Sequence, residues 1–272
     1  MSRISGRFET LRARGRKALI PFLTAGDPDP GMTVSLMRAM VEAGADIIEL
    51  GVPFSDPMAE GPVIQRACER ALRHHVGLGD VFDMVREFRE QDADTPVVLM
   101  GYLNPLEIMG YERFAQSAAE AGADGVITVD LPPEEGEDYV SALRAAGLDP
   151  IFLLAPTSPD DRIERVAASA SGFVYYVSLK GVTGAGHLDI DAVAMRLDQI
   201  RNHCKLPIAV GFGIRDADSA SRLSCLSDGV VVGSRLVQII EDHEGLPAAE
   251  AGIGSEIGRV LREMREAMDD AE

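Results

Sequence analysis

Basic residues are scarce in this sequence of 272 residues. Lysine and arginine together number 26, against 44 aspartates and glutamates, which gives a formal net charge of -18. Only Lys17, Lys180 and Lys205 are lysines. A chain with this charge repels long polyanions, so nucleic acid is not expected as a partner. Genome composition and salt adaptation would both account for the acidic, lysine-poor composition.

Cysteine and long apolar segments are also scarce. Cys68, Cys204 and Cys225 are odd in number and far apart, and no CxxC pair or histidine lies at a metal-ligand spacing. We therefore interpret them as reduced thiols and expect no metal site. No apolar run approaches 18 residues, and residues 1–7 lack the apolar core of a signal peptide. These absences predict a cytoplasmic protein that does not contact a membrane.

The chain instead contains a regular alternation of short apolar runs and helical patterns. Because α/β barrels commonly use about 250 residues, residues 1–272 are expected to form one domain. A first helix at 4–14, with Ser5 as its possible cap, is expected to lie under the barrel as a lid. Strands are predicted at 18–23, 47–51, 96–100, 125–129, 151–154, 173–177, 207–211 and 230–232. Helices are predicted at 30–43, 62–75, 78–91, 112–121, 133–146, 159–170, 190–204, 216–226 and 255–268.

A repeated junction supports this alternation. Glu42-Ala-Gly-Ala-Asp46 precedes one predicted strand, and the same five residues return as Glu120-Ala-Gly-Ala-Asp124 before another. Related forms occur before residues 151 and 230. A glycine near a helix end can take the left-handed conformation before the chain enters the sheet. The pattern favours a closed (β/α)8 TIM barrel, with an open doubly wound sheet as the alternative.

One carboxylate lies inside a predicted buried strand. Glu49 belongs to the run Ile47-Ile-Glu-Leu-Gly51, and side-chain alternation places it on the same face as Ile47 and Gly51. Glutamate is rarely fully buried unless it is paired or functional, because removing its charge from water is costly. An inward acid near the carboxyl end of a barrel strand is placed for catalysis. The competing interpretation is a structural acid with a basic partner opposite.

Glycine-bearing loops follow the last three predicted strands: Gly181-Val-Thr-Gly184, Gly211-Phe-Gly213 and Gly233-Ser234. In barrels, the loops after the seventh and eighth strands and the start of a short extra helix commonly bind phosphate. Backbone amides and the helix dipole favour an anion there, and glycine permits close approach. Each loop alone could be a simple tight turn. Together they predict an anion site at the barrel mouth.

Long motifs now add a resemblance to a known family. They span almost the whole chain: residues 21–28 (PFLTAGDP), 49–57 (ELGVPFSDP), 61–65 (GPVIQ), 101–105 (GYLNP), 130–132 (DLP), 181–184 (GVTG) and 210–214 (VGFGI). These segments resemble the tryptophan synthase alpha subunit family. The resemblance implies retro-aldol cleavage of indole-3-glycerol phosphate to indole and glyceraldehyde 3-phosphate. It also implies no cofactor in this chain, and a beta subunit partner that holds pyridoxal phosphate in an alpha2beta2 heterotetramer and receives the indole.

The resemblance further implies roles for individual residues. Glu49 would transfer both protons, with its pKa raised by burial, and Glu60 would hold the indole N–H where the family usually has aspartate. Tyr175 and Thr183 would support these acids. The remaining implied positions are Gly184, Gly213, Gly233 and Ser234 for the phosphate, Phe22, Met100, Ile127 and Phe212 for the indole ring, and Pro53, Asp56 and Asn104 for the partner interface.

Two other functions remain as alternatives. A sugar-phosphate isomerase or epimerase would share the glycine loops but would use other strand-end acids or a metal. A catalytically weak subunit that mainly activates its partner would explain the unusual Glu60. The resemblance also implies two mobile loops, at 53–62 and 179–188.

Overall fold

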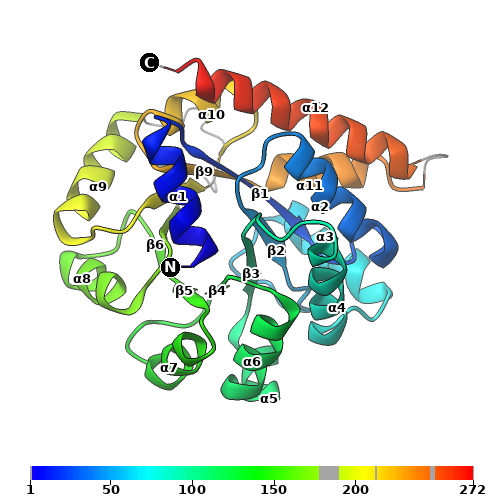
Figure 1. Cartoon of the computed structure of the whole chain (residues 1–272), viewed down its shortest axis with the longest axis horizontal. Coiled ribbons are helices and arrows are strands. Elements are labelled where there is room, and N and C mark those ends of the chain that lie inside the picture. The colour runs from blue at the N-terminus through cyan, green and yellow to red at the C-terminus, as the bar shows by residue number, and fades with distance from the viewer. Residues whose placement is uncertain (1, 178–189, 212, 246–248, 272) are drawn as a thin grey trace.

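The computed structural model shows a ring of parallel strands surrounded by helices (Figure 1). It describes residues 2–177, 190–211, 213–245 and 249–271. Strand order across these residues is β5-β4-β3-β2-β1-β9-β8-β7-β6, with every neighbouring pair parallel. The strands are β1 Ala18–Thr24, β2 Ile48–Gly51, β3 Val97–Gly101, β4 Gly125–Thr128, β5 Asp149–Ile151, β6 Leu153–Leu154, β7 Val174–Val177, β8 Ile208–Gly211 and β9 Gly229–Val232.

The ring closes through a single residue. Strands β5 and β6 follow one another along the chain with only Phe152 between them, and they pair with β4 and β7 respectively. The Phe152 carbonyl accepts a hydrogen bond from the Tyr175 amide at 3.0 Å. The single strand expected at 151–154 is therefore two short strands divided by a bend. If β5 and β6 are counted together as one strand of the barrel, the eight expected strands and the TIM barrel are confirmed.

Helices alternate with the strands as expected, with a few differences in extent. An additional helix, α5, follows β3 where a loop was expected, and α7 begins four residues later than predicted, after the turn ending at Gly136. The helices are α1 Arg3–Ala13, η1 Pro30–Met32, α2 Thr33–Glu42, α3 Pro62–Arg73, α4 Leu78–Arg89, α5 Leu103–Met109, α6 Tyr111–Ala121, α7 Glu137–Ala145, α8 Asp160–Ser169, α9 Ile190–His203, α10 Ala217–Ser224, α11 Ser234–Asp242 and α12 Ala249–Asp269.

The aspartate of the repeated junction joins neighbouring strands. The carboxylate of Asp46, just before β2, accepts a hydrogen bond at 2.9 Å from the Leu19 amide in β1. Asp124, before β4, does the same for Val97 at 2.8 Å in β3, and Asp228, before β9, for Ile208 at 2.9 Å in β8. Each acid thus satisfies an amide at the start of the preceding strand. We call these three acid-to-amide bonds the register bonds.

Helix α1 covers the amino-terminal end of the barrel, as the expected lid helix (Figure 1). Its buried side chains are Ile4, Phe8 and Leu11, and the Phe8 ring packs on Phe173 with centroids 5.8 Å apart. The helix is capped by Ser2, whose hydroxyl accepts the Ser5 amide, so the cap expected at Ser5 was wrong by three residues. An apolar cluster inside the ring rests on this helix.

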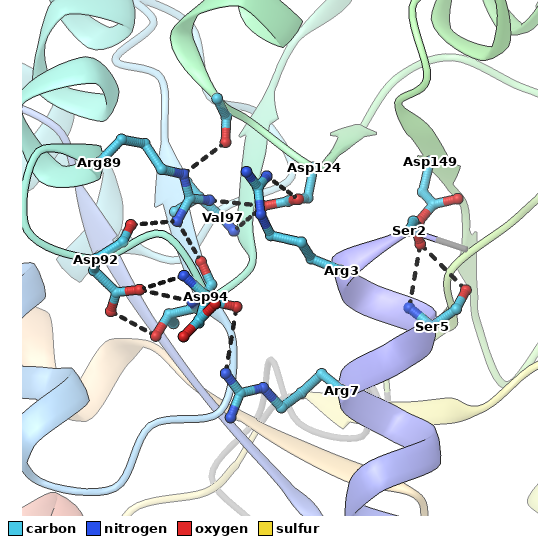
Figure 2. A network of polar contacts seen from close by, with 12 residues as sticks. Ser2, Arg3, Ser5, Arg7, Arg89, Asp92, Asp94, Val97, Asp124 and Asp149 are labelled. Atoms are coloured by element: carbon cyan, nitrogen blue, oxygen red, sulfur yellow. Dashed lines mark hydrogen bonds and ion pairs between the residues drawn. The ribbon is translucent and has the colours of Figure 1, made fainter.

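Polar and charged contacts join α1 to the amino-terminal ends of the strands, as Figure 2 shows. Arg3 and Arg89 each donate to the Asp124 carboxylate at 2.8 Å, one from α1 and one from α4. The Ser2 hydroxyl donates to Asp149 at 2.6 Å. Acids buried at this end therefore have cationic or hydroxyl partners. We call this end of the barrel the floor, and the opposite end, at the carboxyl ends of the strands, the mouth.

Candidate active site

Glu49 lies in β2 on the face directed into the barrel. Ile47, two residues earlier, belongs to the cluster inside the ring, whereas Ile48 and Leu50 belong to the cluster between the strands and the helices. The strand register places Glu49 beside Phe22 of β1 and Val98 of β3. This confirms the alternation expected from the sequence. The carboxyl group points into the mouth rather than toward the outer helices.

Glu49 is buried, and no compensating partner is found for it in the described part of the chain. Its side chain is 1% exposed, and its Oε2 atom has no hydrogen-bond partner among the described residues. No arginine, lysine or histidine of the described chain pairs with it. Burial therefore raises the pKa of Glu49 to about 8, with a further contribution from the negative charge of Glu60. A carboxyl group in this state is protonated at neutral pH and can donate a proton.

Glu60 follows β2 in the loop leading to α3, and its side chain reaches the same cavity as Glu49. Burial raises the pKa of Glu60 to about 7. Two hydrogen bonds hold the loop in place: the Glu60 backbone amide donates to the Pro57 carbonyl at 3.0 Å, and the side-chain amide of Gln65 donates to the Glu60 carbonyl at 2.8 Å. The two acids thus have pKa values near neutrality through the same cause, the removal of their carboxyl groups from water.

An ion-pair cluster fixes helix α3, which begins just after Glu60. Arg70 of α3 is buried and donates to the Asp27 carboxylate at 2.6 and 2.9 Å, in the loop after β1. Arg70 also donates to Glu241 of α11 at 3.1 Å, and Arg66 donates to the same carboxylate at 2.7 Å. These bonds join α3 to α11 and to the end of β1. The helix that carries the Glu60 loop is therefore held against the helix that begins at Ser234.

Tyr175 reaches the acids because a glycine lies on the next strand. Strand β8 places Gly211 two positions beyond Ala209, the register partner of Tyr175, and a Cβ atom on Gly211 would overlap the Tyr175 hydroxyl. Gly51 has the same relation to Phe22, where a Cβ atom would lie 2.6 Å from the ring. Burial, with the negative charges of the two acids, raises the pKa of Tyr175 well above its ordinary value, so the phenol stays neutral.

These groups line one cavity of about 160 Å³ at the barrel mouth. Its acidic and aromatic lining comprises Glu49, Glu60, Phe22, Tyr175 and, beside them, Met100. A larger cavity of about 620 Å³ adjoins it and shares Glu60, Met100 and Tyr175. The lining of the smaller cavity is completed by Gly61, Ile64, Gly213, Ile214, Arg215, Val231, Gly233 and Ser234.

The expected anion-binding residues lie at one side of this cavity. Gly213 adopts φ +82°, and Gly233 is the N-cap residue of α11, whose first residue is Ser234. The first amides of an α-helix have no partner within the helix, and the helix dipole favours negative charge at that end. An anion placed against Gly213, Gly233 and Ser234 would meet such amides.

Some predicted residues lie elsewhere. Ile127 is fully buried in the cluster inside the ring and is not among the residues that line the cavity, although Val129, on the same side of the chain, lines the adjoining cavity. Thr183, Gly184 and Phe212 lie outside the described residues, as does the expected loop at 179–188.

The predicted partner-facing residues differ in exposure. Asp56 and Asn104 are exposed, whereas Pro53 is buried. Tyr102, behind them, stacks on Phe54 with ring centroids 5.1 Å apart, and its hydroxyl accepts a hydrogen bond from the Ala59 amide at 3.0 Å. These two contacts hold the loop that contains Asp56 against the end of β3.

Several lining residues were not identified from the sequence. Ile64, Val231 and Arg215 face the cavity, and Arg215 brings a positive charge to it. A positive charge two residues after the glycine motif Gly211-Phe-Gly213 was the available signal for Arg215. Within the described chain, no group of three or more histidine, cysteine or acidic side chains is arranged to hold a metal ion. The groups that face the cavity can transfer protons and hold an anion.

Comparisons with known proteins agree with this arrangement. The family model described as tryptophan synthase alpha chain matches residues 8–267. The tryptophan synthase alpha chain of Thioalkalivibrio sulfidiphilus is 69% identical over 269 residues, covering 99% of this chain and 100% of the relative. The Nitrosococcus oceani alpha chain is 58% identical over 272 residues, covering 100% and 99%.

Solved structures give the same result for the fold. The crystal structure of tryptophan synthase subunit alpha from Legionella pneumophila superposes with a TM-score of 0.91 at 47% identity, covering 99% of both chains. A chain of tryptophan synthase from M. tuberculosis, in its aminoacrylate-bound form, gives a TM-score of 0.85 at 35% identity, covering 97% of this chain and 100% of that one.

Proposed function

The chain belongs to the tryptophan synthase alpha chain family, whose members are the lyase subunits that cleave indole-3-glycerol phosphate in tryptophan biosynthesis, and we propose that Glu49 and Glu60 perform this chemistry here. The observation that carries the proposal is the burial of Glu49 without a cationic partner among the described residues. A charged structural acid would have a partner, since an unpaired buried carboxylate is costly. A protonated acid has no such requirement.

Cleavage requires two proton transfers at neighbouring atoms. Glu49 first donates its proton to C3 of the indole ring, which places positive charge on the ring nitrogen. The resulting Glu49 carboxylate then removes the proton from the glycerol hydroxyl next to the bond that breaks. The oxygen electrons form the aldehyde of glyceraldehyde 3-phosphate, and the electrons of the carbon–carbon bond return to the ring, which leaves as neutral indole. One carboxyl group thus acts as acid and then as base.

Glu60 holds the indole N–H while positive charge is present on the ring. Its pKa of about 7, below that of Glu49, means that Glu60 is ionised in part of the molecules at neutral pH and loses its proton before Glu49 does. Tyr175 contributes a neutral phenol next to both acids, with Thr183 as a further support outside the described residues. Phe22 and Met100 are proposed as apolar walls for the indole ring, together with Ile127 behind them and Phe212.

The phosphate group is proposed to bind at Gly213, Gly233 and Ser234, with Gly184 as the fourth contact. The first turn of α11 offers amides to the phosphate oxygens. The ion-pair cluster of Arg66, Arg70 and Glu241 holds that helix in fixed relation to the Glu60 loop. The proposed phosphate site and the acid that holds the indole ring are thereby kept at a constant distance from each other.

The partner is expected to be a tryptophan synthase beta subunit, in an alpha2beta2 heterotetramer in the cytoplasm, with pyridoxal phosphate held by the beta subunit and no cofactor in this chain. Pro53, Asp56 and Asn104 are proposed for its interface. Met58 and Ile108, 85% and 82% exposed, lie on the same loop and helix as Asp56 and Asn104. Exposed apolar side chains beside polar ones are typical of an interface. Residues 1–272 are proposed to form one domain.

Within the part of the chain that the structure describes, none of the helices combines the length and apolar character needed to cross a bilayer.

The function is tested by measuring indole release from indole-3-glycerol phosphate with the purified chain, alone and with a beta subunit. We expect turnover that the beta subunit accelerates. Absence of turnover in both conditions would refute the proposed function. The role of Glu60 is tested in the same assay: Glu60→Gln should lower kcat by about 10²-fold, whereas Glu60→Asp should retain activity because the charge is kept.

A further inference from the structure

Arg215 lines the same cavity as Gly213, Gly233 and Ser234, and it is the one cationic residue among the described lining residues. We propose that Arg215 is a specificity-determining residue that binds the phosphate dianion of the substrate and so favours phosphorylated over uncharged indole-glycerol compounds. This inference rests on the proposed function, because it assumes that the phosphate lies at these residues. It adds a side chain to a site otherwise made of backbone amides.

The backbone of Arg215 is held by the start of α10. Its amide donates to the Ser219 hydroxyl at 3.1 Å, and the Ser219 amide donates to the Asp216 carboxylate at 2.9 Å in a capping box. Asp216, the residue after Arg215, also accepts from the Ser219 hydroxyl at 2.7 Å. These bonds and, to a smaller extent, the positive charge of Arg215 lower the pKa of Asp216, and the bonds direct its carboxylate toward its own helix. The helix start therefore fixes the position of Arg215 without using its guanidinium.

The guanidinium of Arg215 is available to a ligand. Among the described residues it forms no hydrogen bond and no ion pair, whereas many of the other arginines pair with acids in this chain of net charge -18. A planar guanidinium can donate two parallel hydrogen bonds to a phosphate. The charge also offsets the negative potential that the surrounding acids would impose on an incoming dianion.

The exposure of Arg215 sets how much it can contribute to phosphate affinity. Arg215 is exposed, so water and salt screen its attraction for the phosphate until the ligand covers it. A charge-assisted hydrogen bond in a protected site would change affinity by about 10- to 100-fold. The screened position of Arg215 predicts the lower end of this range, about tenfold.

The proposal is tested by measuring the binding of two probes to Arg215→Ala with calorimetry. Glycerol 3-phosphate carries the charge without the ring, and 3-indolepropanol carries the ring without the charge. We expect the Kd of glycerol 3-phosphate to rise about tenfold and the Kd of 3-indolepropanol to stay unchanged. The KM of indole-3-glycerol phosphate should rise similarly, with kcat within about twofold of the wild-type value.

Two further variants serve as controls. Arg222→Ala removes an equal charge from α10, where Arg222 and Asp218 form an exposed pair at 3.8 Å, and it should leave both Kd values unchanged. Arg215→Lys keeps the charge but loses the planar fork, and it should recover part of the affinity for glycerol 3-phosphate. Added salt should weaken the binding of glycerol 3-phosphate more for the wild type than for Arg215→Ala.

Two results would overturn the proposal. One is an unchanged Kd of glycerol 3-phosphate in Arg215→Ala, and the other is an equal loss of affinity for both probes, which would indicate a structural role. Failure of the proposed function gives a different result, because the wild type would then not cleave indole-3-glycerol phosphate at all. The binding measurements do not depend on turnover.

Discussion

Asp46 at the floor and Glu49 at the mouth are both buried acids, but their surroundings differ. At the floor, Asp46 accepts hydrogen bonds from the Leu19 amide at 2.9 Å and from Arg265 at 3.1 Å. At the mouth, three residues further along the same segment, Glu49 has no such partner among the described residues, and its Oε2 atom is buried and unbonded. Burial raises the pKa of both groups, but only at Asp46 do an amide and an arginine oppose it.

The contrast indicates that the partnered acid has a structural role and the unpartnered acid a chemical one. A partnered acid fixes the strands, and its removal leaves buried donors unsatisfied. An unpartnered acid stabilises nothing and keeps a proton available near neutral pH. Substitution of a partnered acid such as those at the floor should therefore lower stability, whereas substitution of the unpartnered Glu49 should lower activity.

The largest effect is expected at the mouth. Glu49→Gln keeps the shape of the side chain but can neither donate nor accept the transferred proton. We expect kcat to fall by about 10²- to 10⁴-fold while substrate affinity is nearly unchanged. Steady-state and single-turnover assays of indole release measure the loss, and thermal melting should show a variant at least as stable as the wild type. Near-normal turnover would contradict the assignment of Glu49.

The matching change at the floor should lower stability instead. Asp124→Ala removes the acceptor for the Val97 amide and for Arg3 and Arg89, each at 2.8 Å. We expect the free energy of unfolding to fall by about 3 kcal/mol, with activity per folded molecule retained. Urea unfolding measures this change.

An exposed ion pair provides the control for that measurement. Asp83→Ala removes a contact with Arg86 in which the Asp83 side chain is 74% exposed, and it should change stability by less than about 0.5 kcal/mol. Equal effects of the Asp83 and Asp124 substitutions would show that burial at the floor does not matter.

The stability of the folded chain should depend on pH through Glu49. The pKa of Glu49 is about 8 in the folded chain, above its ordinary value of 4.5. Below pH 4.5 the group is protonated in both states, and between these values only the unfolded state releases the proton. The wild type should therefore lose stability as pH rises through this window, by about 3 kcal/mol more than Glu49→Gln between pH 5 and pH 8.

Urea unfolding of both proteins across this range measures the difference, because the other titrating groups cancel. Parallel curves for the two proteins would show that Glu49 is already ionised in the folded state.

The smallest effect concerns the packing that supports the acids. Gly211→Ala places a methyl group against the Tyr175 hydroxyl, so the ring must move away from Glu49. We expect a stability loss of about 1 to 2 kcal/mol and a several-fold loss of kcat. Gly6→Ala in α1 is the matched control, since a Cβ there meets no atom within 4 Å, and it should be neutral or stabilising by about 0.5 kcal/mol. Equal kcat values for the two variants would contradict the supporting role of Tyr175.

The sequence was sufficient for features encoded by local patterns. Side-chain alternation around Ile47 and Glu49 predicted the inward acid, and the repeated junctions predicted the barrel. Features that depend on distant contacts were missed. Helix α5 begins at Leu103 without a local cap, because its amide donates to Asp130, 27 residues away, at 2.8 Å. The break at Phe152 likewise follows from pairing with two different strands.

The same limit applies to the site. Alternation could place Gly211 on a strand, but its purpose, to admit the Tyr175 ring, depends on the register between β7 and β8. Gly211 was accordingly interpreted only as part of an anion loop. The family resemblance implied Ile127 at the indole ring, and the structure places Ile127 in the cluster inside the ring, a depth that local sequence does not give.

The register bonds have a consequence for how the barrel assembles. Each joins residues only 27, 27 or 20 positions apart, and so lies within one strand-helix-strand repeat. Such a bond needs no contribution from distant parts of the chain and can form as soon as that repeat has left the ribosome. The strand pairs β1–β2, β3–β4 and β8–β9 would then each be aligned independently of the closure at Phe152.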